Sequence, residues 1–91
     1  MCTYQTTHLV IEGAGKGPEG WFPLSEATVY FDHPVAAMAE HTLNVDFRNP
    51  ERGAAARVAV ELDARSAFEL AHAILDSLAG LPERLVGESL S

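Results

Sequence analysis

Apolar and polar residues alternate strictly in two neighbouring stretches of the chain. In residues 41–47, HTLNVDF, the odd positions form one face and the polar Thr, Asn and Asp form the other, and residues 56–62, ARVAVEL, repeat this period of two. Such alternation is typical of half-buried strands. Residues 49–53, NPERG, lie between them and have turn composition, because Asn and Pro favour the start of a turn and Gly tolerates its end. We therefore predict an antiparallel hairpin.

Two earlier stretches predict strands by composition. Residues 3–12, TYQTTHLVIE, and residues 27–31, ATVYF, are rich in β-branched and aromatic side chains. The second strand must end near His33, because Pro34 lacks a backbone donor. Between them, residues 13–23 hold four of the seven glycines and two of the five prolines, which predicts a loop. Residues 34–40 are either a connection or a single helical turn.

After the fourth strand the period changes to that of a helix. Asp63 is placed to cap the helix, and Gly80 and Pro82 are placed to end it. The remaining residues, 81–91, are predicted to be a short C-terminal tail, loose or docked on a partner. Apolar residues recur at the spacings of three, four and seven that form one stripe: Ala67, Leu70, Ala71, Ile74, Leu75 and Leu78.

The element order β-β-β-β-α predicts an α+β fold in one compact domain over residues 1–80. The connections are too short for parallel crossovers, so we expect an antiparallel sheet of about four strands with the C-terminal helix packed on one face. One helix cannot cover both faces of such a sheet. The second strand looks apolar on both sides, because Val29, Tyr30 and Phe31 are consecutive. The uncovered face predicts a homodimer.

Composition and charge narrow the function classes. Hydrophobic residues make up 47% of the 91-residue chain, which is typical of a folded domain. Thirteen acidic residues oppose six scattered basic ones, giving a net charge of −7, which argues against nucleic acid and anionic membrane surfaces as partners. There is no apolar run of about 18 residues, no secretory signal and only one cysteine. We therefore expect a cytoplasmic protein.

The opening stretch, MCTYQTTH, invites a shared site for Cys2 and His8. Both would point to the same face of a strand, but six residues separate them by about 20 Å. Ligands of one metal lie within about 2.0–2.3 Å of it, so the two are not co-ligands in a regular strand. Cys2 is then either a small structural residue or a nucleophile in its own right.

The histidines offer a metal site. His33 ends the second strand and His41 begins the third, so a seven-residue connection brings them close. His8 joins them only if strand one lies beside strand three or runs parallel to strand two; antiparallel pairing of strands one and two keeps it away. Three neutral imidazoles would form an open site for zinc, copper or iron, although H-x7-H is no recognised metal signature.

Other side chains would complete such a site. Asp32 and Glu40 are candidates for a general base or a carboxylate ligand. Trp21 and Tyr30 are candidate substrate contacts, with Trp21 either on a mobile lid or anchored in the core. The glycine-rich segment with Lys16 is no phosphate loop, because a strand rather than a helix follows it and no Ser or Thr comes next.

Four segments, MCTYQTTH, GKGPEGWFPL, VYFDHP and EHTLNVDFRNP, together resemble a small bacterial family of single-domain proteins of unknown function, over about residues 1–80. The resemblance implies a free-standing protein and no particular activity. Our first hypothesis is a metal-dependent enzyme that acts on a small molecule through the histidines. The alternative is a non-catalytic module that binds a hydrophobic small molecule or a protein on an apolar sheet face or in a dimer cavity. A third is a metal-free enzyme using Cys2 or a histidine.

Overall fold

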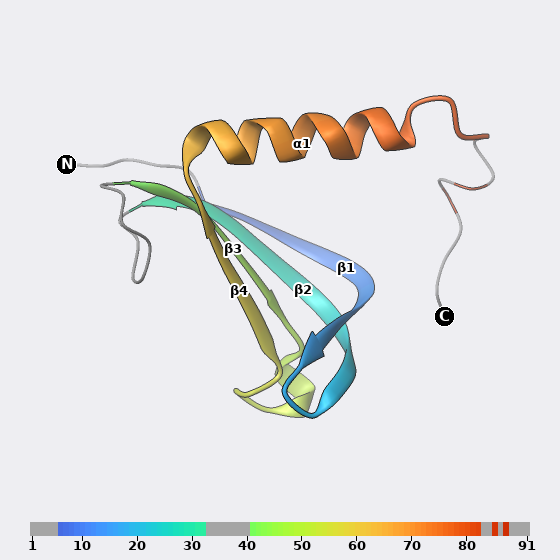
Figure 1. Ribbon diagram of the computed structural model, residues 1–91. Helices are drawn as coiled ribbons and strands as arrows, with labels where there is room; N and C mark the ends of the chain where they lie inside the picture. The colour runs from blue at the N-terminus through green and yellow to red at the C-terminus, as the bar shows by residue number, and fades with distance from the viewer. Residues whose placement is uncertain (1–5, 33–40, 83–84, 86, 88–91) are drawn as a thin grey trace.

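A four-stranded antiparallel sheet and one long helix make up the computed structural model, which describes residues 6–32, 41–82, 85 and 87 (Figure 1). The strands lie side by side in chain order, β1-β2-β3-β4. This arrangement confirms the predicted α+β fold with its β-β-β-β-α order. The elements are β1 (Thr6–Gly17), β2 (Gly20–Asp32), β3 (Thr42–Arg48), the short 3-10 helix η1 (Pro50–Arg52), β4 (Arg57–Leu62) and α1 (Ala64–Leu78).

The prediction of a loop over residues 13–23 is wrong. β1 continues to Gly17 and β2 begins at Gly20, so that only Pro18 and Glu19 form the turn. Gly20 takes the left-handed backbone conformation of this turn, with φ of 112°. Glycine lowers strand propensity, but here each glycine of β1 has a cross-strand partner in β2, and the pairing outweighs the local preference.

The glycines allow the hairpin to bend. The register of β1 against β2 shifts between Val10 and Gly13, and both strands curve strongly towards their turn (Figure 1). On the inside of the bend, a Cβ added to Gly15 would lie 3.0 Å from Leu24 Cδ1 and 3.2 Å from Val58 Cγ2. β1 therefore touches β4 here, and the buried Leu24 belongs to a small core at this end of the sheet.

The turn between β3 and β4 helps to hold this end together. Asn49 is buried, and its side chain accepts a hydrogen bond from the Glu51 backbone N–H at 3.2 Å while it donates to the carbonyl of Pro23 at 3.0 Å. Gly53 closes the turn with φ of 93°. The predicted hairpin is confirmed, with each strand beginning one residue later than expected.

A single residue joins the sheet to the helix. Asp63 follows β4 directly, and its Oδ1 accepts a hydrogen bond from the backbone N–H of Ser66 at 2.7 Å, which confirms the predicted cap. α1 then runs across one face of the sheet and away from it (Figure 1). Along α1, which is described throughout, no residue is buried.

Candidate functional site

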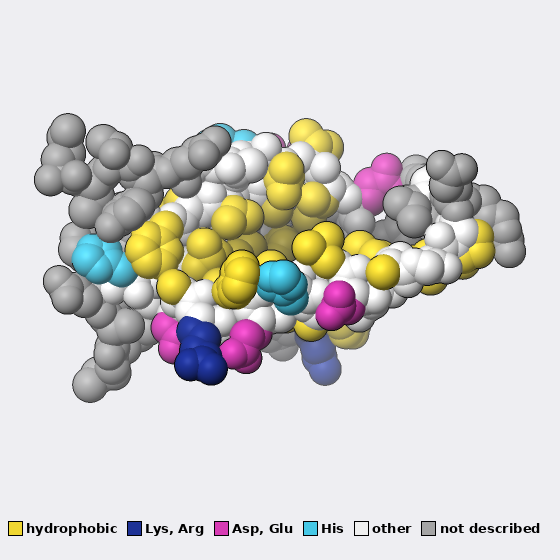
Figure 2. Space-filling model, turned by 90° about the horizontal axis from the view of Figure 1, so that it is seen from above, with side chains coloured by type: hydrophobic (Ala, Val, Ile, Leu, Met, Phe, Trp, Pro, Cys, Tyr) yellow, Lys and Arg dark blue, Asp and Glu magenta, His cyan; other side chains and the backbone are white. Residues whose placement is uncertain are grey.

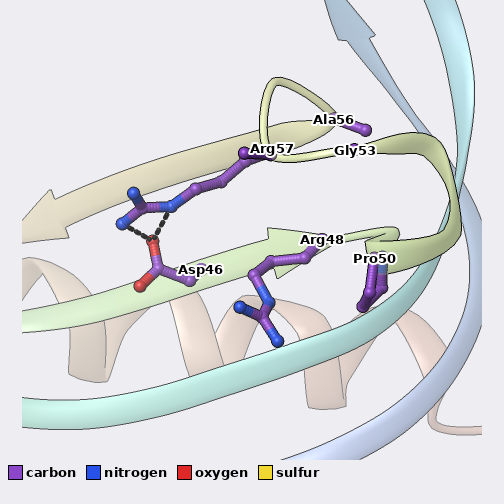
Figure 3. A pocket seen from close by; sticks show the side chains of 7 residues that line it. Asp46, Arg48, Pro50, Gly53, Ala56 and Arg57 are labelled. Atoms are coloured by element: carbon purple, nitrogen blue, oxygen red, sulfur yellow. Dashed lines mark hydrogen bonds and ion pairs between the residues drawn. The ribbon is translucent and has the colours of Figure 1, made fainter.

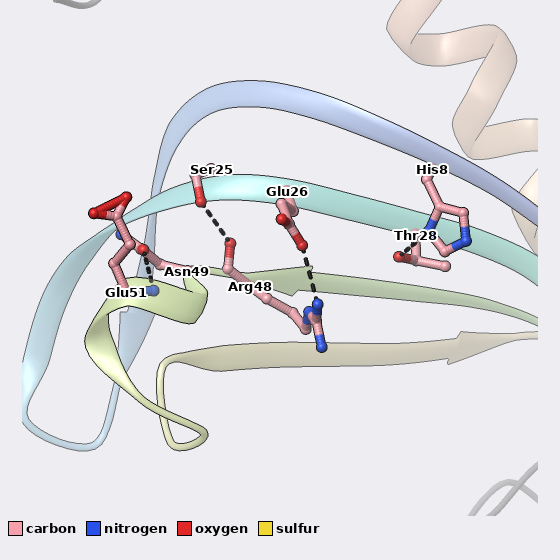
Figure 4. A network of polar contacts seen from close by, with 7 residues as sticks. All are labelled: His8, Ser25, Glu26, Thr28, Arg48, Asn49 and Glu51. Carbon is pink, nitrogen blue, oxygen red and sulfur yellow. Dashed lines mark hydrogen bonds and ion pairs between the residues drawn. The ribbon is translucent and has the colours of Figure 1, made fainter.

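The structure separates two of the three predicted metal-ligating histidines. His8 pairs with Thr28 across β1 and β2, and its Nδ1 lies 3.1 Å from Thr28 Oγ1 (Figure 4). His41 precedes β3, and its ring stacks on Phe31 with centroids 6.0 Å apart. Thr28 also lies opposite Asp46, five residues beyond His41, a distance of about 16 Å along a strand. His8 and His41 are thus too far apart to share a metal within one chain.

The remaining predicted site residues are scattered or undescribed. Cys2, His33 and Glu40 lie outside the described residues. Asp32 is the last residue of β2, with its backbone opposite Thr42. Within the described ranges, no three His, Cys, Asp or Glu side chains lie close enough together to hold a metal ion.

The two predicted substrate contacts do not meet. Trp21 lies in β2 opposite Lys16, with 69% of its surface exposed, so it neither anchors a loop in the core nor sits on a lid. Tyr30 lies between Val29 and Phe31, which both face α1, and alternation along the strand therefore directs Tyr30 to the other face.

The sheet face turned away from α1 carries paired charges. Arg57 donates two hydrogen bonds to Asp46 Oδ1, at 2.8 and 3.1 Å, and this carboxylate raises the pKa of Arg57 through the hydrogen bonds first and its charge second. Arg48 pairs with Glu26 at 3.0 Å (Figure 4). Both arginines line a shallow pocket of about 520 Å³ beside the β3–β4 turn (Figure 3). Because each guanidinium already has a carboxylate partner, an anion would have to compete for it.

The other face of the sheet forms an apolar groove with α1. Its volume is about 620 Å³, and every strand contributes to it. Figure 2 shows the hydrophobic side chains gathered in the hollow beside the helix, with charged side chains along the outer side. The described residues that line this groove are all apolar: Leu9, Ile11, Ala27, Val29, Phe31, Leu43, Val45, Phe47, Val60, Leu62, Ala64, Ala67, Phe68, Leu70, Ala71 and Ile74.

The groove is open because α1 leaves the sheet rather than lying flat on it. Phe68 is 67% exposed, and Leu70 and Ile74, which also line the groove, are about half exposed. Apolar side chains gain roughly 25 cal/mol for each Å² removed from water, so a surface of this kind favours an apolar occupant. No titratable side chain is among the described residues of the lining, and its chemistry therefore favours binding over proton transfer.

Sequence reasoning found the helical stripe but missed the contribution of β1. Leu9 and Ile11 line the groove, and Val10 between them is 93% exposed. Because Leu9, Val10 and Ile11 are consecutive apolar residues, the sequence shows no alternation from which their face could be predicted. What the pattern did not show is that the helix and the sheet leave a gap between them.

The chain matches the Family of unknown function (DUF6295) over residues 1–87. No curated protein and no solved structure matches the chain. Among the helices in the described part of the chain, none has both the length and the apolar character needed to cross a membrane.

Proposed function

Since the chain belongs to this family, whose function is unknown, we propose from its own geometry that the protein is a non-catalytic binding module. Its site is the apolar groove between α1 and the sheet. The observation that carries the proposal is that all the described residues lining this groove of about 620 Å³ are apolar, while no residue of α1 is buried. The volume lies within the range of about 300–1,000 Å³ found for ligand sites.

From the sequence we expected a hydrophobic small molecule or a partner protein as ligand, and a homodimer through the sheet face that the helix leaves uncovered. The groove lies on the face that α1 crosses, so an occupant of the groove would bury the stripe of α1. The single cysteine favours a reducing compartment, and we propose the cytoplasm as the location. The metal-dependent enzyme stays a prediction, because His33 and Glu40 lie outside the described residues.

A solvatochromic apolar dye such as Nile red tests whether the groove binds. We expect its fluorescence to rise with protein at concentrations low enough to keep the chain monomeric. Ile74→Glu puts a charge into the groove and should lower the binding of the dye at least tenfold, because burying an unpaired carboxylate is costly. Ala73→Glu is the matched control, since this neighbouring residue is exposed and does not line the groove.

Equal dye binding by the Ile74→Glu and Ala73→Glu variants would contradict the proposal, provided that circular dichroism shows the same helix content in both. A monomeric wild-type protein that binds no dye would contradict it as well.

A further inference from the structure

Building on the binding module proposed above, we infer that the occupant of the groove is a second copy of this chain. In this arrangement two copies pair reciprocally, so that the apolar stripe of each α1 packs against the open sheet face and helix of the other.

The exposed apolar side chains of α1 are the first support. Phe68, Leu70, Ile74, Leu75 and Leu78 each keep between 49% and 67% of their surface in contact with water. Apolar surface of this extent along one described helix is typical of an interface, and a standard stable interface buries about 800 Å² of each partner.

The C-terminal end of α1 is the second support for a second copy as the occupant. Leu75 and Leu78 belong to the apolar stripe, yet they do not line the groove of their own chain. Leu75 is 64% exposed and Leu78 is 49% exposed. The stripe therefore extends beyond the surface that the chain's own sheet offers. A second chain that enters the groove would cover these two leucines at the same time.

Self-complementarity favours a second copy over a foreign partner. An interface with two-fold symmetry uses the same patch twice, so each chain must carry both halves of every contact. This chain carries an apolar helix stripe and an apolar sheet face next to each other, with no charge among the described residues of the lining. A foreign protein would have to supply one of these surfaces, whereas a second copy supplies both.

The junction of sheet and helix explains why one chain does not close the groove alone. Only Asp63 lies between Leu62 and Ala64, and its carbonyl accepts the first helical hydrogen bond, from Ala67 at 3.0 Å. With no linker, the direction of α1 follows that of β4. The hydrogen bond from the Ser66 backbone N–H to Asp63 fixes the start of α1 directly after β4.

Sedimentation equilibrium and light scattering of the full chain test this inference. We expect a mass of twice 9.8 kDa at micromolar concentrations. Leu75→Glu should raise the dimer dissociation constant at least tenfold without changing helix content, because Leu75 does not line the groove of its own chain. Ala73→Glu adds the same charge on the opposite side of α1 and should leave the mass at that of a dimer.

The dye separates this inference from the proposed function. Dye fluorescence per chain should fall as the protein concentration rises into the dimer range. A monomer at all concentrations that still binds the dye would overturn the dimer and leave the binding module standing, with a small apolar ligand as its occupant. A monomer that binds no dye would overturn both. A dimer unaffected by Leu75→Glu would overturn the reciprocal arrangement.

Discussion

Gly15 sits on the inside of the bend in the β1–β2 hairpin, where two side chains close around it. A Cβ at this position would lie 3.0 Å from Leu24 and 3.2 Å from Val58, closer than side chains normally pack. Gly13 lies on the same strand, and a Cβ there would meet nothing within 4 Å. An alanine side chain would therefore crowd Leu24 and Val58 at position 15 but meet open space at position 13.

We expect Gly15→Ala to lower the free energy of unfolding by about 1 kcal/mol, because the cost of overpacking exceeds the entropy that alanine removes from the unfolded chain. Gly13→Ala should be neutral or slightly stabilising, since only the entropic effect applies. Urea unfolding of both variants measures the difference. Equal stabilities would show that Leu24 and Val58 move aside without cost.

The histidines allow a second test at the residue scale. His8 and His41 lie too far apart for one metal, so a site built by His33 and His41 would not need His8. We expect zinc binding, measured by calorimetry on metal-free protein, to be lost in His41→Ala and retained in His8→Ala. If the metal-free wild-type protein takes up no zinc, copper or iron, the predicted site does not exist.

At the scale of elements, the cap of α1 links stability to pH. Ser66 lowers the pKa of Asp63 through its side chain and its backbone N–H. A carboxyl group whose pKa is lower in the folded state stabilises the fold above its unfolded pKa, and this contribution is lost as the pH falls through the folded value. The charged carboxylate also interacts favourably with the N-terminal end of the helix dipole.

Asp63→Ala should lower the melting temperature by a few degrees at pH 7, and the difference from wild type should vanish as the pH falls below the usual range of a carboxyl group. Asp76→Ala is a suitable control, because Asp76 is exposed in the last turns of α1 and caps nothing. Melting curves of the three proteins at several pH values measure this. A difference that persists at low pH would argue against the cap as its origin.

The elements with a clear period could be predicted from the sequence, and the glycine-rich one could not. A hydrophobic period of two residues predicted β3 and β4 as strands, and a period of 3.6 residues predicted α1 as a helix. The predicted boundaries of the two strands lie within one residue of those in the structure. Four glycines give the whole segment a loop composition, so the position of the turn at Pro18–Glu19 could not be predicted. What keeps this segment in a strand is tertiary: Gly17 lies under the ring of Phe22, and Gly15 under Leu24. Such contacts depend on cross-strand register, which local composition does not reveal.

For the whole molecule, the net charge opposes dimerisation, whereas the apolar groove favours it. Each chain carries a net charge of −7, so a dimer brings two like-charged bodies together. Salt shortens the screening length from roughly 10 Å at 0.1 M to 3 Å at 1 M. The repulsion therefore weakens with salt, while the apolar contacts do not.

We expect the dimer dissociation constant to fall roughly threefold or more between 0.05 and 0.5 M sodium chloride. Sedimentation at several protein concentrations measures it. A dissociation constant that rises with salt would indicate an interface held by ion pairs, such as those of Arg48 and Arg57 on the other face, rather than by the groove.

The candidate site could be predicted only in part at this scale. An apolar sheet face and an apolar stripe on α1 follow from the sequence pattern, and both line the groove. The angle between them does not, because it is set at a one-residue junction whose geometry has no signature in the pattern of hydrophobic positions. The position of His8 depended on strand pairing, which the sequence left open. The structure has the antiparallel pairing of β1 and β2, the alternative that keeps His8 away from His41.

The strand order β1-β2-β3-β4 has a consequence for how the chain folds. Every neighbouring pair in the sheet is also consecutive in the chain, so each pairing closes only a short loop and the contact order of the sheet is low. The sheet can therefore form quickly and in a single chain, whereas covering the groove with a second chain requires an encounter. Refolding should show a fast phase independent of protein concentration, followed by a slower one that accelerates with it.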